Sequence, residues 1–183
     1  MEPEPQLRGR FGRPFTFVER CASTQRLLDG APEGAVVAAG EQTEGRGRLG
    51  RTWHAPAGTS LLFSIVLEPD VPPARLPELS LVAGAAVAEA IEVETALPTD
   101  VKHPNDVLIR GRKVAGILAE AVDGRVVVGI GVNVSQTEGQ LHDPAVATSL
   151  ALEGATVGQV DLLTTILERL EARYDGWVSG AGT

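Results

Sequence analysis

The feature that most restricts the fold is a strand-length run in which nearly every side chain is apolar. Residues 61–67 read Leu-Leu-Phe-Ser-Ile-Val-Leu, and prolines at 69, 72 and 73 follow. An apolar run this short, closed by proline, indicates a β-strand that is buried on both of its faces. The chain must therefore supply packing partners on both sides of this strand.

Further strands are predicted from apolar or alternating segments, and helices from apolar residues spaced three and four apart. The predicted strands cover 15–18, 35–39, 107–109, 114–122 and 125–133, and the predicted helices cover 23–30, 79–91 and 163–177. Because most strands come in a consecutive group, with helices between and after them, the predicted class is α+β.

Length and composition indicate one ordinary folded domain. The chain has 183 residues, of which 43% are hydrophobic and 22% charged, so a single apolar core can be buried. We predict a loose leader at residues 1–14, one domain at 15–178 and a tail at 179–183. Cys21 is the only cysteine, which excludes an internal disulfide and favours a reducing, cytoplasmic location.

Charge and hydropathy argue against two other classes of protein, membrane-spanning proteins and general nucleic-acid binders. No apolar stretch approaches the roughly 20 residues of a membrane helix, and the polar start of the chain is not typical of a signal peptide. The net charge is −8, whereas a general nucleic-acid binder is normally basic. Any site for an anion must therefore be a local arrangement of cations.

A loop rich in glycine and arginine is the first candidate for a site. Residues 45–51 read Gly-Arg-Gly-Arg-Leu-Gly-Arg, within a polar stretch from 41 to 58. Glycines let a backbone approach a ligand, and guanidinium groups offer paired donors to phosphate or carboxylate. The spacing differs from a P-loop and from a dinucleotide fingerprint. By itself the loop is equally consistent with a solvated basic loop or an arginine–glycine segment that binds nucleic acid.

Two shorter patterns carry further polar side chains. Residues 102–106, Lys-His-Pro-Asn-Asp, predict a turn, and the oxygens of Asn105 and Asp106 are candidate contacts for a nucleotide or its Mg²⁺. His103 has no clear partner and is interpreted as a packing or surface residue. Lys113 stands at the start of an apolar strand. It has two interpretations: a cation that faces a buried anion, or a lysine at the edge of the strand whose ammonium group is solvated.

The last pattern is Gly-Ile-Gly-Val-Asn at 129–133, which places two glycines in a strand and indicates either close approach of a ligand or a β-bulge.

No Ser/His/Asp set, zinc-protease motif or Cys-x-x-Cys pair occurs in the sequence. Cys21 has no obvious base, so a small buried residue is the favoured interpretation over a nucleophile.

Taken in order, these patterns resemble the catalytic domain of biotin–protein ligases, also called biotin–acetyl-CoA-carboxylase ligases. The series comprises Ser23-Thr24, Gln42, the glycine–arginine run that ends at Trp53, Lys-x-Pro-Asn-Asp, Lys113 and Gly-Ile-Gly-Val-Asn. Residues 147–150 and the closing helix are also similar to that family. The match covers about residues 15–178, and although each motif is weak alone, the ordered set is highly specific.

The resemblance implies a fold and a reaction. The fold is a mixed β-sheet with helices packed against it, similar to class II aminoacyl-tRNA synthetases and lipoate ligases. In the reaction, biotin and ATP, which enters with Mg²⁺, form biotinyl-5′-AMP and pyrophosphate. A lysine of a biotin carboxyl carrier domain then takes the biotinyl group. Both substrates of the first step are anions, so cations must offset their repulsion.

The resemblance also implies roles for individual residues. Lys113 and Arg48 are the expected catalytic residues. The expected biotin contacts are Ser23, Thr24, Gln25, Gln42, Arg46, Gly47, Arg48, Lys113 and Gly116. The expected contacts of ATP or the adenylate are Gly45, Arg48, Arg51, Trp53, Asn105, Asp106 and Asn133, with Trp53 covering the adenine. No dedicated metal site is expected beyond a Mg²⁺ position near Asn105 and Asp106.

Some features depart from the family pattern and leave alternatives open. The family usually has tryptophan at His103, asparagine or methionine at Gln25, and asparagine at Ser60. A small β-barrel domain usually follows the final helix, so we expect slower transfer to the carrier from a chain that ends at Thr183. Without a helix-turn-helix segment, no DNA binding is expected. The sequence leaves open whether the protein forms a homodimer.

Three alternative functions remain open. They are a catalytically impaired biotin-binding module, a lipoate or octanoate transferase of the same fold, and a nucleic-acid-binding module.

Overall fold

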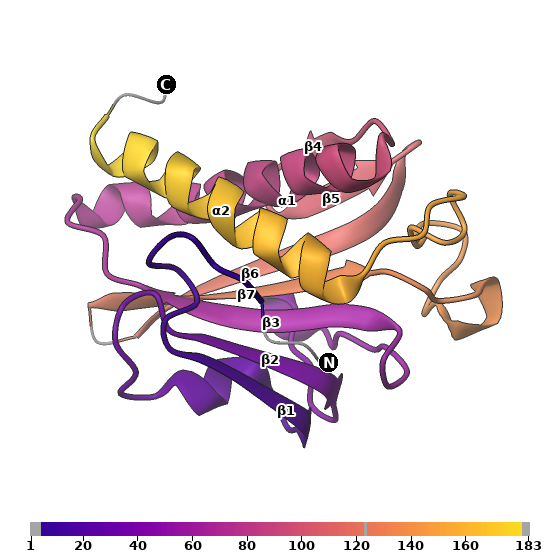
Figure 1. Ribbon diagram of the computed structural model, residues 1–183, viewed down its shortest axis with the longest axis horizontal. Helices are drawn as coiled ribbons and strands as arrows, with labels where there is room; N and C mark the ends of the chain where they lie inside the picture. The colour runs from indigo at the N-terminus through magenta and orange to yellow at the C-terminus, as the bar shows by residue number, and fades with distance from the viewer. Residues whose placement is uncertain (1–4, 123, 181–183) are drawn as a thin grey trace.

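The computed structural model describes residues 5–122 and 124–180. Its strands form one seven-stranded sheet in the order β1-β2-β3-β7-β6-β5-β4 (Figure 1). Only β1 and β2 are parallel, and every other neighbouring pair is antiparallel, which confirms the predicted mixed sheet. The strands are β1 (Phe15–Cys21), β2 (Val36–Gln42), β3 (Ser60–Leu67), β4 (Asp100–Lys102), β5 (Asp106–Ile109), β6 (Arg112–Val122) and β7 (Arg125–Asn133).

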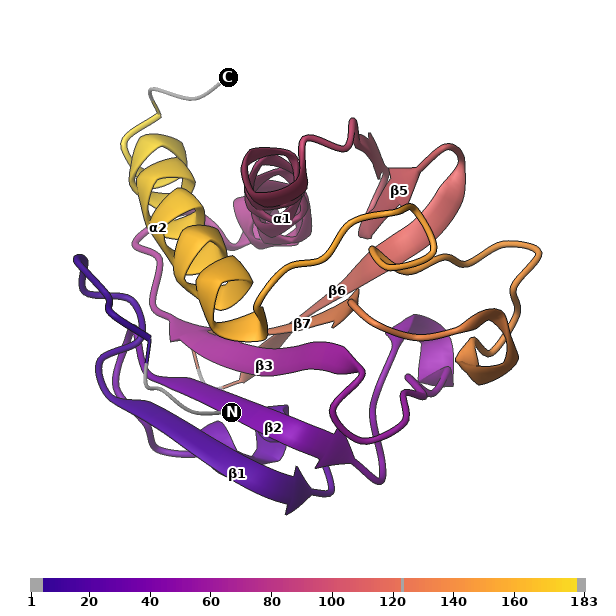
Figure 2. The same cartoon turned by 45° about the vertical axis from the view of Figure 1, so that its right-hand side comes forward.

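Two long helices cover one face of this sheet (Figure 2). They are α1 (Leu79–Thr95) and α2 (Gln159–Val178), both of which were predicted from their apolar stripes. The described residues also form four short 3₁₀ helices: η1 (Thr24–Leu28), η2 (Arg48–Gly50), η3 (Pro73–Glu78) and η4 (Glu138–Gln140). In the part of the chain that the structure describes, no helix has the length and apolarity needed to cross a bilayer.

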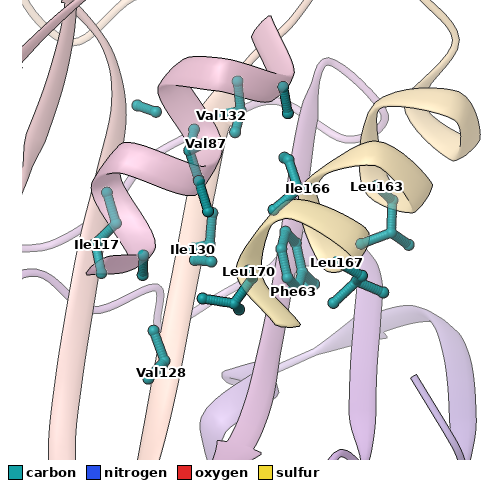
Figure 3. Packing of buried hydrophobic residues seen from close by; sticks show 14 of the residues in the cluster. Phe63, Val87, Ile117, Val128, Ile130, Val132, Leu163, Ile166, Leu167 and Leu170 are labelled. Atoms are coloured by element: carbon teal, nitrogen blue, oxygen red, sulfur yellow. The ribbon is translucent and has the colours of Figure 1, made fainter. Parts of the chain in front are cut away.

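The main core lies between the sheet and these two helices. Every residue of β3 is buried, as its apolar run predicts. Figure 3 shows Phe63 of β3 packed beneath Ile166 and Leu170 of α2, with Ile130 of β7 beside them. A smaller apolar cluster on the other face of the sheet contains Leu28 of η1 together with Ala35, Val37 and Val66.

The described part of the N-terminal segment, residues 5–14, packs against α2 and is not the loose leader that we expected. Phe11 is only 1% exposed, and its ring centroid lies 5.5 Å from that of Tyr174. The Phe11 amide donates a hydrogen bond to Glu171, and the Arg10 guanidinium pairs with Asp175. A single anchoring aromatic residue has no periodicity, so a search for apolar patterns does not detect it.

Candidate functional site

A cavity of about 320 Å³ opens on the sheet face that the long helices leave uncovered. Side chains alternate along a strand, so Phe63 and Ile130 face the helices while Ser64, Gly129 and Gly131 face this cavity. The structure gathers most of the predicted site residues around it: Ser23, Thr24, Gln25, Gln42, Arg46, Gly47, Arg48, Arg51, Trp53, Asn105, Asp106, Lys113 and Gly116. They come from η1, β2, the loop that contains η2, the β4–β5 turn and β6.

One part of the cavity wall is a buried polar cluster made by three side chains. The Thr24 amide and hydroxyl both donate to Oε1 of Gln42, at 2.7 and 3.0 Å. The hydroxyls of Thr24 and Ser64 lie 2.7 Å apart, and both residues are almost fully buried. The remaining hydrogen-bonding capacity of these groups makes this wall suited to a polar, uncharged group of a ligand.

Ser64 is a site residue that our sequence analysis missed. It was included in the strand at 61–67 only as part of an apolar run. The signal was nevertheless present, because Ser64 is the one polar residue inside the apolar run 61–67. A buried hydroxyl needs a partner, and a polar residue at such a position indicates either an internal hydrogen bond or a ligand contact.

Gln25 lies flat against the strand glycine Gly129. A Cβ atom at residue 129 would come 3.1 Å from the Gln25 side chain, so this glycine makes room for the glutamine. The amide nitrogen of Gln25 reaches the carbonyls of Leu118 and Val127 at 3.3 and 3.4 Å. Gln25 therefore forms a wall of the cavity across β6 and β7.

One of the cations that line the cavity is the ammonium group of Lys113. Its Nζ lies 2.7 Å from Oδ1 of Asp106 and 5.5 Å from the ring centroid of Trp53. Oδ1 of Asp106 is buried and has no hydrogen bond of good geometry, so its contact with Lys113 is chiefly electrostatic. An ammonium group held by one carboxylate and one aromatic face can exchange that carboxylate for an anionic ligand.

Trp53 rests on two glycines of the sheet. A Cβ atom at residue 116 or 131 would come 2.9 or 2.7 Å from its indole ring. The glycine pair in β7 therefore allows close approach by protein side chains, and the register of β7 contains no bulge. The indole nitrogen is buried and has no hydrogen-bond partner within residues 5–122 and 124–180. The expected contact of this ring with adenine stays a prediction.

The glycine–arginine loop is tied to the sheet by Arg46. Its guanidinium donates two hydrogen bonds of 2.7 Å to the carboxylate of Glu120 on β6. In this conformation Arg46 is therefore committed to Glu120, although we expected its charge to face the substrates. The Arg48 guanidinium makes a long 3.4 Å contact with Oδ1 of Asn105, and its charge lies at the cavity mouth.

The β4–β5 turn is held by Asn105. Its side-chain amide donates to the carbonyl of Ile117 at 2.9 Å, and its own carbonyl accepts from the Ile117 amide at 2.9 Å. Asn105 thereby fixes the turn to β6, with Asp106 beside Lys113. His103 lies exposed at the rim of the cavity.

Gly45 and Asn133 do not line the cavity, so their expected nucleotide contacts gain no support from the geometry. The Asn133 side chain is 5% exposed, and both its ends are used internally. Its amide donates to the Thr148 carbonyl at 2.9 Å, and its oxygen accepts from Gln136 at 3.0 Å. Asn133 thus secures the segment after β7. Gly45 packs against the backbone of Trp53, 2.4 Å from where its Cβ would stand.

Two further observations concern metals and nucleophiles. Among residues 5–122 and 124–180, no three His, Cys, Asp or Glu side chains are grouped to hold a metal ion. The single carboxylate of Asp106 beside Asn105 fits a Mg²⁺ ion that arrives on substrate phosphates, because such an ion needs only one or two protein carboxylates. Burial raises the pKa of the Cys21 thiol, which disfavours a nucleophilic thiolate.

Comparison with known proteins places this chain in a family. Over 181 residues, the chain is 37% identical to the bifunctional ligase/repressor BirA of Bacillus subtilis, covering 92% of this chain and 56% of that protein. It is 42% identical over 157 residues to the biotin–[acetyl-CoA-carboxylase] ligase of Mycobacterium tuberculosis, covering 83% and 59%. The chain thus spans somewhat more than half the length of these curated relatives.

The fold comparison agrees with the sequence comparison. The biotin protein ligase of Aquifex aeolicus, solved in complex with biotin and ATP, superposes with a TM-score of 0.79 at 33% identity, covering 89% of this chain and 71% of that one. Residues 16–153 match the biotin/lipoate A/B protein ligase family. This match covers well over half of the chain, and the chain therefore belongs to the biotin/lipoate A/B protein ligase family.

Proposed function

We propose that this protein is an ATP-dependent biotin ligase, which activates biotin as biotinyl-5′-AMP and transfers it to a lysine of a biotin carboxyl carrier protein. One observation carries the proposal: a single cavity combines the buried polar cluster of Thr24, Gln42 and Ser64 with the ammonium group of Lys113. Biotin has the matching chemistry, with an uncharged ureido ring at one end and a carboxylate at the other.

The apolar body of biotin fits the rest of the wall. Leu62 and Leu118 line the cavity, together with the indole ring of Trp53. Small-molecule sites are typically apolar with a few well-placed polar groups, and a volume of about 320 Å³ is at the lower end of that class. The ureido ring would take hydrogen bonds from the polar cluster, while the chain would extend toward Lys113.

The first chemical step joins two anions, and the cations lower its barrier. An oxygen of the biotin carboxylate forms a bond to the α-phosphorus of ATP while the bond from that phosphorus to pyrophosphate breaks. Lys113 would contact the carboxylate and then the acyl-phosphate, with Arg48 and Arg51 at the cavity mouth facing the phosphates. Charges fixed before the reaction stabilise the transition state without reorganisation. Mg²⁺ bound to ATP would supply further charge neutralisation beside Asn105 and Asp106.

Asp106 has a separate role in this mechanism. In the structure its carboxylate holds the Lys113 ammonium group at 2.7 Å. When the biotin carboxylate arrives, it replaces Asp106 as the nearest anion, and the Asp106 oxygens become available to the nucleotide and its Mg²⁺. The second step then forms an amide: the neutral amine of the carrier lysine attacks the acyl carbon, the bond to AMP breaks, and the amine loses a proton.

A lipoate or octanoate transferase is the competing reaction within this family. The polar cluster discriminates between the two, because a dithiolane ring or an alkyl end would leave the remaining hydrogen-bonding capacity of Thr24, Gln42 and Ser64 unused. A site whose polar groups are only partly paired by a ligand loses affinity for that ligand. The cluster therefore favours biotin.

The test is incubation of the protein with ATP, Mg²⁺ and biotin, lipoate or octanoate in separate arms. Mass spectrometry of the acyl-adenylate and release of pyrophosphate measure the first step, and labelling of an added biotin carboxyl carrier domain measures the second. We expect biotinyl-AMP and a biotinylated carrier. If lipoate or octanoate formed an adenylate and biotin did not, that acid would be the substrate in place of biotin. Tight biotin binding without adenylate would indicate the impaired binding module.

The proposal extends to location and partners. A cytoplasmic location is supported by the single cysteine and by the carrier protein that the reaction requires. The net charge of −8 supports a protein that does not bind nucleic acid through its overall field. A gel-shift assay at physiological salt, with and without biotin and ATP, should show no sequence-specific complex.

A further inference from the structure

A buried carboxylate outside the cavity is the strongest feature that the proposed mechanism leaves unused. The Glu153 side chain is 0% exposed and lies in the segment between β7 and α2. Its Oε1 accepts from the Arg112 guanidinium at 2.6 Å and from the Thr148 hydroxyl at 2.7 Å. Its Oε2 accepts from Arg110 at 3.2 Å. A buried carboxylate is costly unless it is paired and hydrogen-bonded, so these partners hold Glu153 in one geometry.

The partners of Glu153 are not equivalent. Arg110 is 71% exposed, whereas Arg112 is 35% exposed and Thr148 is fully buried. An exposed ion pair is weakened by solvent, while contacts inside the protein are held more strongly. Arg112 and Thr148 are therefore the two partners through which Glu153 has its main structural effect.

Both partners lead directly to the backbone of Lys113. Arg112 is its neighbour in sequence, and the amide of Thr148 donates to the Lys113 carbonyl at 2.9 Å. The Lys113 amide in turn donates to the Val146 carbonyl at 2.8 Å. The pairing of β6 with β7 ends at Ala115 and Val132, so the segment 146–148 takes the place of β7 beside Lys113. The position of Lys113 thus depends on a segment that is not a regular strand.

We propose that Glu153 is a positioning residue for Lys113, acting through Arg112 and Thr148 to fix the irregular segment against the start of β6. The inference rests on the proposed function, because it assigns Lys113 to the activation of biotin. A catalytic cation must be held to within about 0.5 Å of its productive position by the groups around it. Glu153 supplies that restraint from outside the cavity, without touching either substrate.

The first test compares variants in the adenylation assay. Glu153→Gln keeps the size of the side chain and removes its charge, and Thr148→Val replaces the hydroxyl with a methyl group. We expect each to lower kcat for biotinyl-AMP formation, about tenfold for Glu153→Gln, with a much smaller change in the KM for biotin. Thr148→Ser retains the hydroxyl and should restore most of the rate. Glu89→Gln is the matched control, because it breaks an ion pair with Arg173 between the two long helices and should leave kcat unchanged.

The second test asks whether Glu153 acts through Lys113. In a Lys113→Ala background, Glu153→Gln should cause no further loss of rate, since a positioning residue has nothing left to position. The same fractional loss in both backgrounds would overturn the proposal. An unchanged kcat in Glu153→Gln, accompanied only by a lower Tm, would also overturn it. If Glu153→Gln fails to fold, Thr148→Val carries the same comparison.

A third measurement separates this proposal from the proposed function. The chain has two lysines, Lys102 and Lys113, so labelling by an amine-reactive ester can be read at both by mass spectrometry. We expect Glu153→Gln to change the ratio of labelling at Lys113 to labelling at Lys102, whether or not the wild-type protein makes adenylate. A wild-type protein that makes no adenylate would refute only the proposed function. An unchanged ratio would refute the role of Glu153 while leaving the function standing.

Discussion

The two faces of the central sheet are built from the same strands and serve different purposes. On the face covered by α1 and α2, β3 and β7 present large apolar side chains such as Phe63 and Ile130 (Figure 3). On the opposite face, the next residues along the same strands are Ser64, Gly129 and Gly131, which line the cavity. One residue step along a strand therefore changes the environment from packed core to ligand site.

This difference shows how the fold separates stability from binding. The helix-covered face buries apolar area, which is the main source of folding free energy. The cavity face carries small residues, hydroxyls and cationic side chains, which leave room and partners for a ligand. Substitutions on the first face should therefore change stability, and substitutions on the second should change activity. Four predictions test this separation.

The largest effect is expected on the helix-covered face. Phe63 is 1% exposed, and Phe63→Ala should lower the free energy of unfolding by about 3–5 kcal/mol through lost burial and a new cavity. Urea denaturation followed by circular dichroism measures this loss. Phe63→Leu, which conserves more volume, should cost clearly less. A loss as small as that of a surface substitution would mean that this face is not the core.

The next effect is expected on the cavity face, at Lys113. Removing its ammonium group should cost about 2–4 kcal/mol of transition-state stabilisation, because a charge-assisted contact in a water-poor site is lost. Lys113→Ala should therefore lower biotinyl-AMP formation at least roughly tenfold, while circular dichroism and Tm stay close to wild type. Adenylation at the wild-type rate would remove Lys113 from the catalytic role.

A smaller effect is expected at Ser64, on the same strand as Phe63 but on the other face. Ser64→Ala removes the hydroxyl that contacts Thr24, which should weaken biotin binding by about 1 kcal/mol, or roughly fivefold in Kd. Isothermal titration calorimetry measures this change. Ser60→Ala is the matched control, since its hydroxyl is buried without a partner on the same strand and lies outside the cavity. Equal effects of the two substitutions would contradict a ligand role for Ser64.

The same comparison explains what the sequence could predict about the fold. The helices α1 and α2 and the strand β3 follow from apolar patterns, because burial leaves a regular spacing of side chains in the sequence. The packing of Phe11 against Tyr174 does not, because it is a single contact between segments far apart in the chain. In β3, the apolar residues on both faces also conceal the alternation that would distinguish the core face from the cavity face.

For the site, too, the sequence could predict one part and not another. Motif resemblance brought together the residues around Lys113, and the structure groups them in one cavity. It could not predict what each polar side chain contacts, because that depends on residues outside the motifs. Arg46 pairs with Glu120, and Asn133 bonds to Thr148 and Gln136. Motif membership therefore predicted location better than role.

The smallest effect is expected where the glycine–arginine loop meets the cavity face. The Arg46–Glu120 pair has two hydrogen bonds of 2.7 Å, but the side chains are 44% and 31% exposed. Solvent screening limits a pair of this kind to about 1 kcal/mol or less, even with bidentate geometry. Glu120→Gln should therefore reduce amide hydrogen-exchange protection of residues 45–53 by at most about fivefold in the ligand-free protein. Added salt should reduce the difference between variant and wild type.

Arg48 provides the contrast that makes this last prediction decisive. Among the described residues, its guanidinium has one hydrogen bond, the 3.4 Å contact with Asn105, so Arg48→Gly should leave loop protection nearly unchanged without ligands. With biotin and ATP bound, Arg48 gains phosphate oxygens as partners, and the same variant should then lose protection and release biotinyl-AMP faster. Loss of protection in ligand-free Arg48→Gly, with none in Glu120→Gln, would reverse the assignment of the two arginines. The loop would then be anchored from the cavity side and not from β6.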